Sequence, residues 1–404
     1  RRDVLRGVGA AGVVAGAMAV GAGPAYADAP VRSFKARGRF RRRPNFLVVI
    51  VDEQRTPPVY ETEMLTRWRQ ENLPTQNLLR SQGMDFTHHH IMATACAPSR
   101  ASFFTGQYPS LHGVTQTTGL AKGSLEPDVF WLDPRTVPTM GHWFRAAGYD
   151  TYYKGKWHVS EADLMQPGTT SSLPTFDEDL NRSPTLEQVY LDANRLGPYG
   201  FDGWVGPEPH GSNPLNSASS GPNGKGRDAI FAAQGTELLQ QLRTAKRPWL
   251  AVTSFVNPHD IVLWGNLSLA QQKLYLAQQL VGSTVPTELF VDRQFAATRF
   301  DDLGAKPSAQ ASYKATYPKA LQPVVNGLEY HRFYYELQKR VDVEIGKVLA
   351  ELMSSKAMYR DTVVVYLSDH GDMLGSHNAL YQKWHVAYDE VVRVPFVIHN
   401  PRLF

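Results

Sequence analysis

The chain has 404 residues, of which 42% are hydrophobic and 20% are charged, so it is long enough to bury a large core as one or two domains. Its formal net charge is +4, but ten of its 42 Lys/Arg and only two of its 38 Asp/Glu lie in residues 1–43. Residues 44–404 therefore carry 32 basic and 36 acidic residues, a net charge of −4, which argues against a basic body built to bind nucleic acid.

Residues 1–27 have the three parts of an export signal: a charged start, a short stretch rich in glycine, alanine and valine, and a small-x-small cleavage site ending at Ala27. The paired arginines at positions 1 and 2 and the weakly apolar middle resemble a twin-arginine (Tat) signal, which exports folded proteins. A membrane anchor is disfavoured because the apolar stretch is short and glycine-rich. We therefore expect a secreted or periplasmic bacterial protein that uses the Tat export machinery and has no stable membrane insertion. Residues 28–43 are predicted to form a basic linker.

From residue 44 onward, apolar runs and helical spacing alternate along the chain. In chain order they predict a strand at 46–51, a helix at 73–82, a strand at 84–91, helices at 98–105 and 137–147, strands at 149–153 and 249–255, a helix at 327–354, and strands at 362–367 and 394–398. Residues 160–228 are rich in Pro, Gly, Ser and Asn, lack periodicity, and are predicted to form a long loop region. Strands that alternate with helices are typical of an α/β fold, here a doubly wound, mostly parallel central sheet with helices on both faces.

Four chemically active side chains come just after predicted strands: Asp52, Lys156, His259 and Asp369. Taken singly, such aspartates are usually turn or cap residues, and such lysines are usually solvated. Ligands of doubly wound sheets bind at the carboxyl ends of the strands, however, so four such residues together predict a single active site.

Cys96 is the only cysteine of the chain. Exported proteins normally use cysteines in pairs, and a single cysteine cannot form an internal disulfide. Cys96 is therefore either a buried structural residue or a chemically active one, and its sequence neighbours favour the second.

Cys96-Ala97-Pro98-Ser99-Arg100 has the C-x-P-x-R spacing, and with it the chain resembles the type I, formylglycine-dependent sulfatases of the alkaline phosphatase-like superfamily. The resemblance extends from about residue 44 to the end of the chain, because further family motifs follow in order. They are Asp-Glu-Gln at 52–54, Gly-Lys-Trp-His at 155–158, Asn-Pro-His at 257–259, Asp-His-Gly-Asp at 369–372, and Lys383 ahead of Arg-Val-Pro at 393–395.

The resemblance implies hydrolysis of sulfate monoesters, on a small molecule or a glycan, with Cys96 oxidised to formylglycine by a formylglycine-generating enzyme. Hydrated formylglycine offers two hydroxyl groups, one to attack sulfur and one to expel sulfate. A phosphodiester or phosphonate monoester hydrolase on the same fold is the alternative, and a non-catalytic binding protein is a more distant one. The single set of carboxylates favours sulfate, and a non-catalytic protein is expected to have lost at least one of Cys96, Arg100, Lys156 and Lys383.

The same resemblance assigns roles to individual residues. A divalent cation, Ca²⁺ with Mg²⁺ or Mn²⁺ as alternatives, is expected on Asp52, Glu53, the modified Cys96, Asp369 and His370. Two of these positions depart from the commonest family pattern, since position 53 is more often aspartate and position 370 is often asparagine. Sulfate is expected to bind Lys156, Lys383 and His259, with Arg100 and His158 on the two formylglycine hydroxyls and His259 as general acid toward the leaving oxygen.

Two further expectations concern the three consecutive histidines and a carboxy-terminal domain. His88, His89 and His90 are predicted to be structural or pocket-lining, because consecutive strand residues face opposite sides and cannot converge on one ion. Family members usually continue into a smaller carboxy-terminal domain, so residues 44–404 are expected to form a C-terminally incomplete catalytic domain.

Overall fold

The computed structural model describes residues 38–118, 122–209, 217–218, 226–263, 284–294, 296–320 and 327–404. The predicted export signal and the predicted linker up to residue 37 lie outside the described residues. Among the helices in these ranges, none combines the length and the apolar character that a membrane crossing requires.

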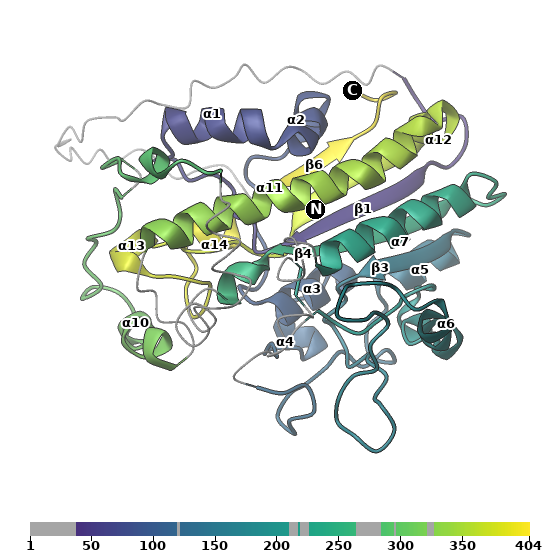
Figure 1. Ribbon diagram of the computed structural model, residues 1–404, viewed down its shortest axis with the longest axis horizontal. Coiled ribbons are helices and arrows are strands. Elements are labelled where there is room, and N and C mark those ends of the chain that lie inside the picture. Colours follow the sequence, from purple (N-terminus) through teal and green to yellow (C-terminus); the bar gives the residue numbers. More distant parts are fainter. Residues whose placement is uncertain are drawn as a thin grey trace, which may run out of the picture. The chain divides into compact units, whose positions relative to one another are not determined.

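A six-stranded sheet forms the centre of the fold, in the order β2-β6-β5-β1-β4-β3 (Figure 1). Its strands β5, β1, β4 and β3 run parallel, while β6 is antiparallel to β5 and the edge strand β2 is antiparallel to β6. The predicted α/β class and mostly parallel sheet are therefore confirmed. The strands are β1 Asn45–Asp52, β2 Gly83–Asp85, β3 Asp150–Gly155, β4 Trp249–Pro258, β5 Thr362–Ser368 and β6 Phe396–His399.

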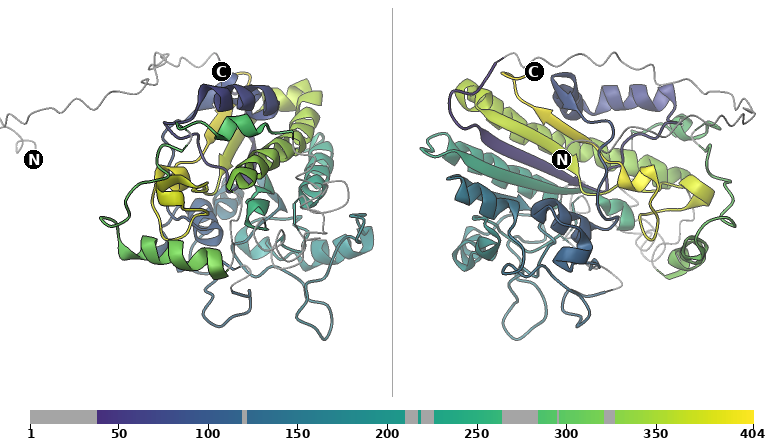
Figure 2. Two further views of the ribbon diagram at one scale, coloured as in Figure 1. Left: turned by 60° about the vertical axis from the view of Figure 1, so that its left-hand side comes forward. Right: turned by 180° about the vertical axis from the view of Figure 1, so that it is seen from behind.

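Both faces of the sheet are covered, as the alternation of side chains along β1 shows. Leu47, Val49 and Val51 pack into one apolar cluster with α7 (Arg227–Leu242) and α11 (Gly327–Ser354). Val48 and Ile50 point to the other face, where they pack with apolar residues of α3 (Cys96–Thr105). Figures 1 and 2 show α7 and α11 side by side along the sheet.

The other helices of the described residues are shorter than α7 and α11. They are α1 Glu63–Asn72, α2 Pro74–Ser81, α4 Pro109–His112, α5 Met140–Ala146, α6 Pro184–Ala193, α10 Ser308–Ala320, α12 Lys356–Arg360, α13 Ser376–Ala379 and α14 Asp389–Val392, with 3-10 turns at Gly197–Tyr199, His259–Leu263 and Thr287–Phe290.

The predicted strand at 84–91 is wrong beyond Asp85. Strand β2 is an edge strand whose only neighbour in the sheet is β6, and its pairing ends with Asp85 opposite Val397. Beyond it the regular ladder is replaced by a single hydrogen bond from Phe86 N to Phe396 O at 2.9 Å and an isolated bridge between His90 and Arg393. His88 and His90 are exposed, while the ring of His89 stacks on Phe396 with 4.5 Å between centroids.

The prediction of a continuous loop over 160–228 is also wrong in part, because it contains α6 and the first two residues of α7. Helix α6 begins after Ser183, whose hydroxyl accepts a hydrogen bond from the Leu186 amide, and Pro184 occupies its first turn. Only Glu187 and Tyr190 are buried in it, so its apolar stripe is too narrow to give a helical period in the sequence.

Candidate active site

The ends of four parallel strands bring the candidate residues to one edge of the sheet. Asp52 ends β1, and Asp369, Lys156 and His259 directly follow β5, β3 and β4. A register shift after Ile50 pairs Asp52 with the last residue of β4, which places Asp52 beside the start of the His259 segment. The four segments thus converge as the strand ends predict.

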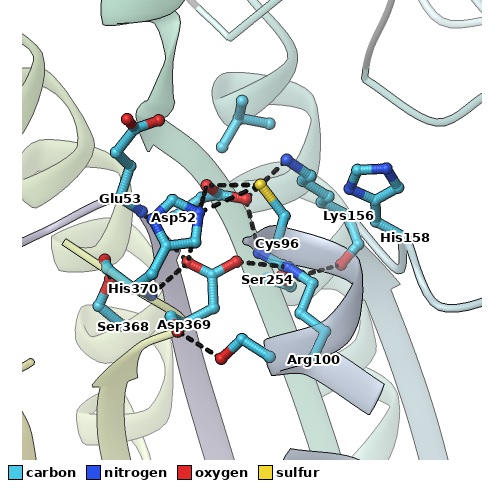
Figure 3. A network of polar contacts seen from close by, with 12 residues as sticks. Asp52, Glu53, Cys96, Arg100, Lys156, His158, Ser254, Ser368, Asp369 and His370 are labelled. Carbon is cyan, nitrogen blue, oxygen red and sulfur yellow. Dashed lines mark hydrogen bonds and ion pairs between the residues drawn. The ribbon is translucent and has the colours of Figure 1, made fainter. Parts of the chain in front are cut away.

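Cys96 is the first residue of α3 and lies inside this group, with 2% of its surface exposed. Its Sγ is 3.1 Å from His370 Nε2 and 3.8 Å from Asp52 Oδ1 (Figure 3). Burial raises the pKa of the Cys96 thiol, and the negative charge of Asp52 raises it further. An unmodified thiol is therefore protonated at neutral pH here and is a poor nucleophile.

The donor atoms around Cys96 fit a divalent cation. One ligand atom from each of Asp52, Cys96, Asp369 and His370 lies within 4.8 Å of the others, and all four residues are buried. His370 Nδ1 donates to the Gly371 carbonyl oxygen at 3.0 Å, so the lone pair of Nε2 faces the group. Carboxylate oxygens are the ligands that Ca²⁺ and Mg²⁺ prefer, and the imidazole nitrogen also suits Mn²⁺.

Glu53 lies outside this four-residue group. Its backbone is left-handed, with φ 71°, and its Oε2 accepts a hydrogen bond from Lys383 Nζ at 2.8 Å. Its Oε1 is buried and has no hydrogen-bond partner among the described residues, although Glu53 could share a ligand group with Asp52 and His259. Burial, opposed by the charge of Lys383, raises the pKa of Glu53 well above its usual range.

Two buried basic side chains neutralise the carboxylates of the group. Arg100 donates from Nε to Asp369 Oδ2 at 2.7 Å and from Nη2 to Asp52 Oδ2 at 3.1 Å. Lys156 Nζ lies 2.6 Å from the same Asp52 oxygen. Burial opposes ionisation of Asp52, but nearby positive charge, chiefly that of Lys156, outweighs it and holds the pKa of Asp52 well below its usual range.

The two candidate proton-transfer residues are His158, after β3, and His259, after β4. His158 adopts a left-handed backbone with φ 53°, and its Nε2 is 2.9 Å from the hydroxyl of Thr118. His259 has a ligand atom within 4.8 Å of Asp52 and Glu53. Burial and the charge of Lys156 hold the pKa of His259 well below its usual value, so its imidazole is neutral at pH 7 before substrate binds.

The structure adds polar residues that sequence patterns did not identify. Ser254 accepts a hydrogen bond from Arg100 Nη1 at 3.0 Å, and Glu208 accepts hydrogen bonds from the backbone at positions 157 and 158. Glu208 follows His158 by 50 residues and lies in the segment that was predicted to be a loop. No local motif links the two residues, so no spacing rule would have paired them.

An open cavity of about 930 Å³ lies next to Cys96. Part of the cavity lining comes from Ala95, which directly precedes α3, and from Pro98, which lies in the first turn of α3. The opposite lining is aromatic and comes from α10 and from the residue that follows Lys383; it includes Tyr313, Tyr317 and Trp384. The cavity thus opens beside Cys96 between α3 and α10.

The loop that carries Lys383 is held by a partly buried histidine between two carboxylates. His377 Nδ1 is 2.8 Å from Asp301 Oδ2, and its Nε2 is 3.3 Å from Glu390 Oε1. Its ring also stacks on Tyr388 with 3.8 Å between centroids. Burial disfavours the charged imidazole, but the bonds to Glu390 and Asp301 outweigh burial and raise the pKa of His377 above 6.5.

Protonated His377 is therefore expected to stabilise the fold. Its contribution is fully present below about pH 6.5, where the unfolded chain also binds the proton, and is lost as the pH rises through the higher folded pKa. Urea unfolding of His377→Gln from pH 5.5 to 9 should show the largest loss of stability at the acidic end. His88→Gln, at an exposed histidine, is the control and should match the wild type throughout. A loss that grows with pH would contradict the ion pairs described here.

A family model described as Sulfatase matches residues 44–404. Uncharacterized sulfatase YidJ of Escherichia coli (strain K12) is 27% identical over 374 residues, which cover 89% of this chain and 63% of that protein. A crystal structure of a putative sulfatase from Bacteroides thetaiotaomicron has a TM-score of 0.55 at 20% identity, covering 89% of this chain and 65% of that one. The chain thus spans less than two thirds of the length of both. The structure of a phosphonate monoester hydrolase from Agrobacterium radiobacter is similar too, with a TM-score of 0.53 at 18% identity, covering 89% of this chain and 68% of that one, so the fold does not separate the two activities.

Proposed function

The chain belongs to the sulfatase family, and we propose that it hydrolyses sulfate monoesters of a small molecule or a glycan. Residue 96 is the nucleophile in this proposal, after a formylglycine-generating enzyme has oxidised it to formylglycine, and a divalent cation, Ca²⁺ in the first place, assists it. The supporting observation is the position of Cys96 Sγ, 3.1 Å from His370 Nε2 and 3.8 Å from Asp52 Oδ1, in a buried group that also contains Asp369.

Hydrated formylglycine would supply one hydroxyl to accept the sulfuryl group and a second one to release it as sulfate. Asp52, Asp369 and His370 would hold the cation with residue 96, and the cation would neutralise sulfate oxygens and favour the ionised hydroxyl. Arg100 fixes the two carboxylates at 2.7 and 3.1 Å, so the ligand set is preorganised by this chain alone.

Lys156 and Lys383 are assigned to the sulfate oxygens. Both are buried, and each pairs with a carboxylate in this structure, Lys156 with Asp52 and Lys383 with Glu53. An incoming sulfate would compete with Glu53 for Lys383 and free a carboxylate that lies near Asp52. Glu53 is therefore assigned as a further ligand that completes the cation site once substrate is bound.

The two histidines are assigned to separate proton transfers. His158 is placed to accept a proton from formylglycine when sulfate leaves, and His259 to protonate the leaving oxygen. The low pKa of His259 in the free site is compatible with this role, because a bound sulfate ester brings negative charge that raises it.

A phosphodiester or phosphonate monoester hydrolase remains the second candidate, because the structure of the phosphonate monoester hydrolase is about as similar to this chain as that of the sulfatase. Among the residues that the structure describes, both possible ligand groups share Asp52, which supports one cation rather than two separate metal clusters. A single cation with two lysines suits a sulfate monoester better. A non-catalytic binding protein is disfavoured because Cys96, Arg100, Lys156 and Lys383 are all present and buried.

The proposal includes maturation before Tat-dependent export to the periplasm or the exterior. The predicted Tat pathway carries folded protein, whereas Cys96 is buried after folding and must be oxidised on the unfolded chain. Peptide mass spectrometry should find residue 96 lighter by about 18 Da in precursor retained in the cytosol, the difference between the CH₂SH and CHO side chains. Unmodified Cys96 in that precursor, with formylglycine only outside, would contradict this order.

Metal dependence is tested with the full chain, coexpressed with a maturation enzyme. We expect hydrolysis of 4-nitrophenyl sulfate to fall at least about 100-fold after chelation and to return with Ca²⁺. Binding of the cation should also raise the unfolding temperature, which is a readout independent of catalysis. Faster hydrolysis of bis(4-nitrophenyl) phosphate or of a phenylphosphonate ester would favour the second candidate. Full activity in the presence of chelator would show that hydrolysis does not require the proposed cation.

A further inference from the structure

A buried carboxylate holds the backbone behind Lys156 and His158. Glu208 is 2% exposed, and its Oε1 accepts hydrogen bonds from the amides of His158 at 2.7 Å and Trp157 at 3.0 Å. From the other side, the Lys156 carbonyl accepts from Arg100 Nη1 at 2.8 Å and from Tyr153 OH at 2.6 Å. The segment is therefore fixed at two consecutive peptide groups, 156–157 and 157–158, which supports the left-handed conformation of His158.

A second buried carboxylate does the same for the segment that leads to His259. Asp228, the second residue of α7, accepts the amide of Val256 on Oδ1 at 2.7 Å and the amide of Asn257 on Oδ2 at 3.1 Å. It is 2% exposed. His259 follows this clamped pair after a single residue, so its backbone position depends on α7 as well as on β4.

The carboxylates of Glu208 and Asp228 each act as a clamp on two backbone amides. These two clamps belong to one buried charged cluster. Arg227, next to Asp228, donates to the carbonyl of Pro207 at 2.7 Å, and the Glu208 amide donates to Asp163 Oδ1 at 2.7 Å. Burial raises the pKa of Glu208 to about 7 and that of Asp228 well above its usual range. Burying such groups is costly, and neither belongs to the possible ligand groups around Cys96.

We propose that Glu208 and Asp228 are positioning residues that act through backbone amides, Glu208 on Lys156 and His158 and Asp228 on His259. The inference rests on the proposed function, because it assigns to each clamp the role of the residues that it holds. It divides the site into a sulfuryl-binding side, fixed by Glu208, and a leaving-group side, fixed by Asp228.

The two sides predict different kinetics. Lys156 and His158 act on the sulfuryl group and on formylglycine, which are the same for every substrate. His259 acts on the leaving oxygen, and protonation matters more for a poor leaving group such as an alcohol than for 4-nitrophenol. Loss of the Glu208 clamp should therefore slow all substrates alike, whereas loss of the Asp228 clamp should slow poor leaving groups most.

The test measures kcat/KM for a series of aryl sulfates and one alkyl sulfate in Glu208→Gln and Asp228→Asn. We expect Glu208→Gln to lose about 10- to 100-fold on every ester with an unchanged dependence on leaving-group pKa. Asp228→Asn should steepen that dependence and lose at least about tenfold more on the alkyl ester than on 4-nitrophenyl sulfate. Unchanged dependence in Asp228→Asn, or full activity in Glu208→Gln, would overturn the inference.

Asp342→Asn is the matched control. Asp342 is also buried and accepts two consecutive amides, those of Thr75 at 2.9 Å and Gln76 at 3.0 Å, but it holds the start of α2. It should lower the unfolding temperature without changing the dependence on leaving-group pKa. The same change in all three variants would mean that loss of stability, not positioning, explains the result.

Amide hydrogen exchange tests the clamps apart from catalysis. Glu208→Gln should speed exchange at residues 157 and 158, and Asp228→Asn at 256 and 257, with the milder Glu208→Asp and Asp228→Ser as replacements for a variant that fails to fold. Unchanged exchange would refute the clamps. A wild-type protein without sulfatase activity, but with these exchange effects, would refute the proposed function and leave the clamps as structural features only.

Discussion

Cys96→Ala is expected to abolish sulfate ester hydrolysis, with kcat/KM falling by at least about 10⁴-fold, while the protein stays folded. The substitution removes the proposed nucleophile and only one buried atom, since an alanine side chain keeps the Cβ at the first position of α3. Turnover of 4-nitrophenyl sulfate measures the loss, and circular dichroism verifies the fold. Activity within tenfold of the wild type would mean that residue 96 is not the nucleophile.

Cys96→Ser separates attack from release. A serine hydroxyl can take the sulfuryl group but has no second hydroxyl on the same carbon to expel it. We expect at most one equivalent of 4-nitrophenol per protein molecule, followed by arrest, and a gain of about 80 Da on the peptide that contains residue 96, the mass of SO₃. Continuous turnover by this variant would contradict the need for the aldehyde hydrate.

Asp52→Asn is expected to combine a large kinetic loss with a large loss of stability. The substitution leaves the buried Arg100 and Lys156 without the carboxylate that lies 3.1 and 2.6 Å from them. Breaking such a pair from one side costs about 3–5 kcal/mol of unfolding free energy, and loss of a cation ligand should lower kcat/KM by at least about 10³-fold.

The stability loss should depend on pH in a defined direction. Because the folded pKa of Asp52 is depressed, its contribution is present above the unfolded pKa near 3.8 and is lost as the pH falls through the lower folded value. Chemical unfolding in chelator at neutral and acidic pH measures this difference. Asp133→Asn, at the exposed partner of Arg135, is the control and should leave the unfolding midpoint unchanged.

A double-mutant cycle tests the pair itself. Asp52→Asn combined with Lys156→Met removes both partners, so the double variant should be less destabilised than the sum of the single variants. Additive losses would mean that Asp52 and Lys156 do not interact in solution.

The sequence was sufficient to predict the edge of the sheet at which the site lies. Asp52 and Asp369 follow continuous apolar runs, and parallel strands end at a common edge, so their proximity follows from the strand pattern alone. Helix α3 was expected from residue 98 but begins at Cys96. That difference places the nucleophile position in the first turn of the helix rather than in the loop before it.

Other parts of the site could not be predicted because they depend on backbone geometry and on distant contacts. The family resemblance assigned Glu53 as a cation ligand, but its left-handed backbone accompanies a side chain that is bonded to Lys383 in this structure. Glu208 and Asp228 hold amides 50 and 28 residues away. Their carboxylates carry no local pattern that distinguishes them from surface acids, and only tertiary packing shows that they are buried.

Part of the wall of the open cavity beside Cys96 comes from a helix that carries none of the candidate site residues. Tyr313 and Tyr317 belong to α10, which is not part of the central sheet. Asp52, in contrast, ends β1, which pairs with β4 on one side and with β5 on the other. Under the proposed function, variation in α10 would therefore change which ester fits without moving the groups proposed to cleave it. Substitutions meant to change the substrate range are therefore best placed in α10, with the residues of the central strands left unchanged.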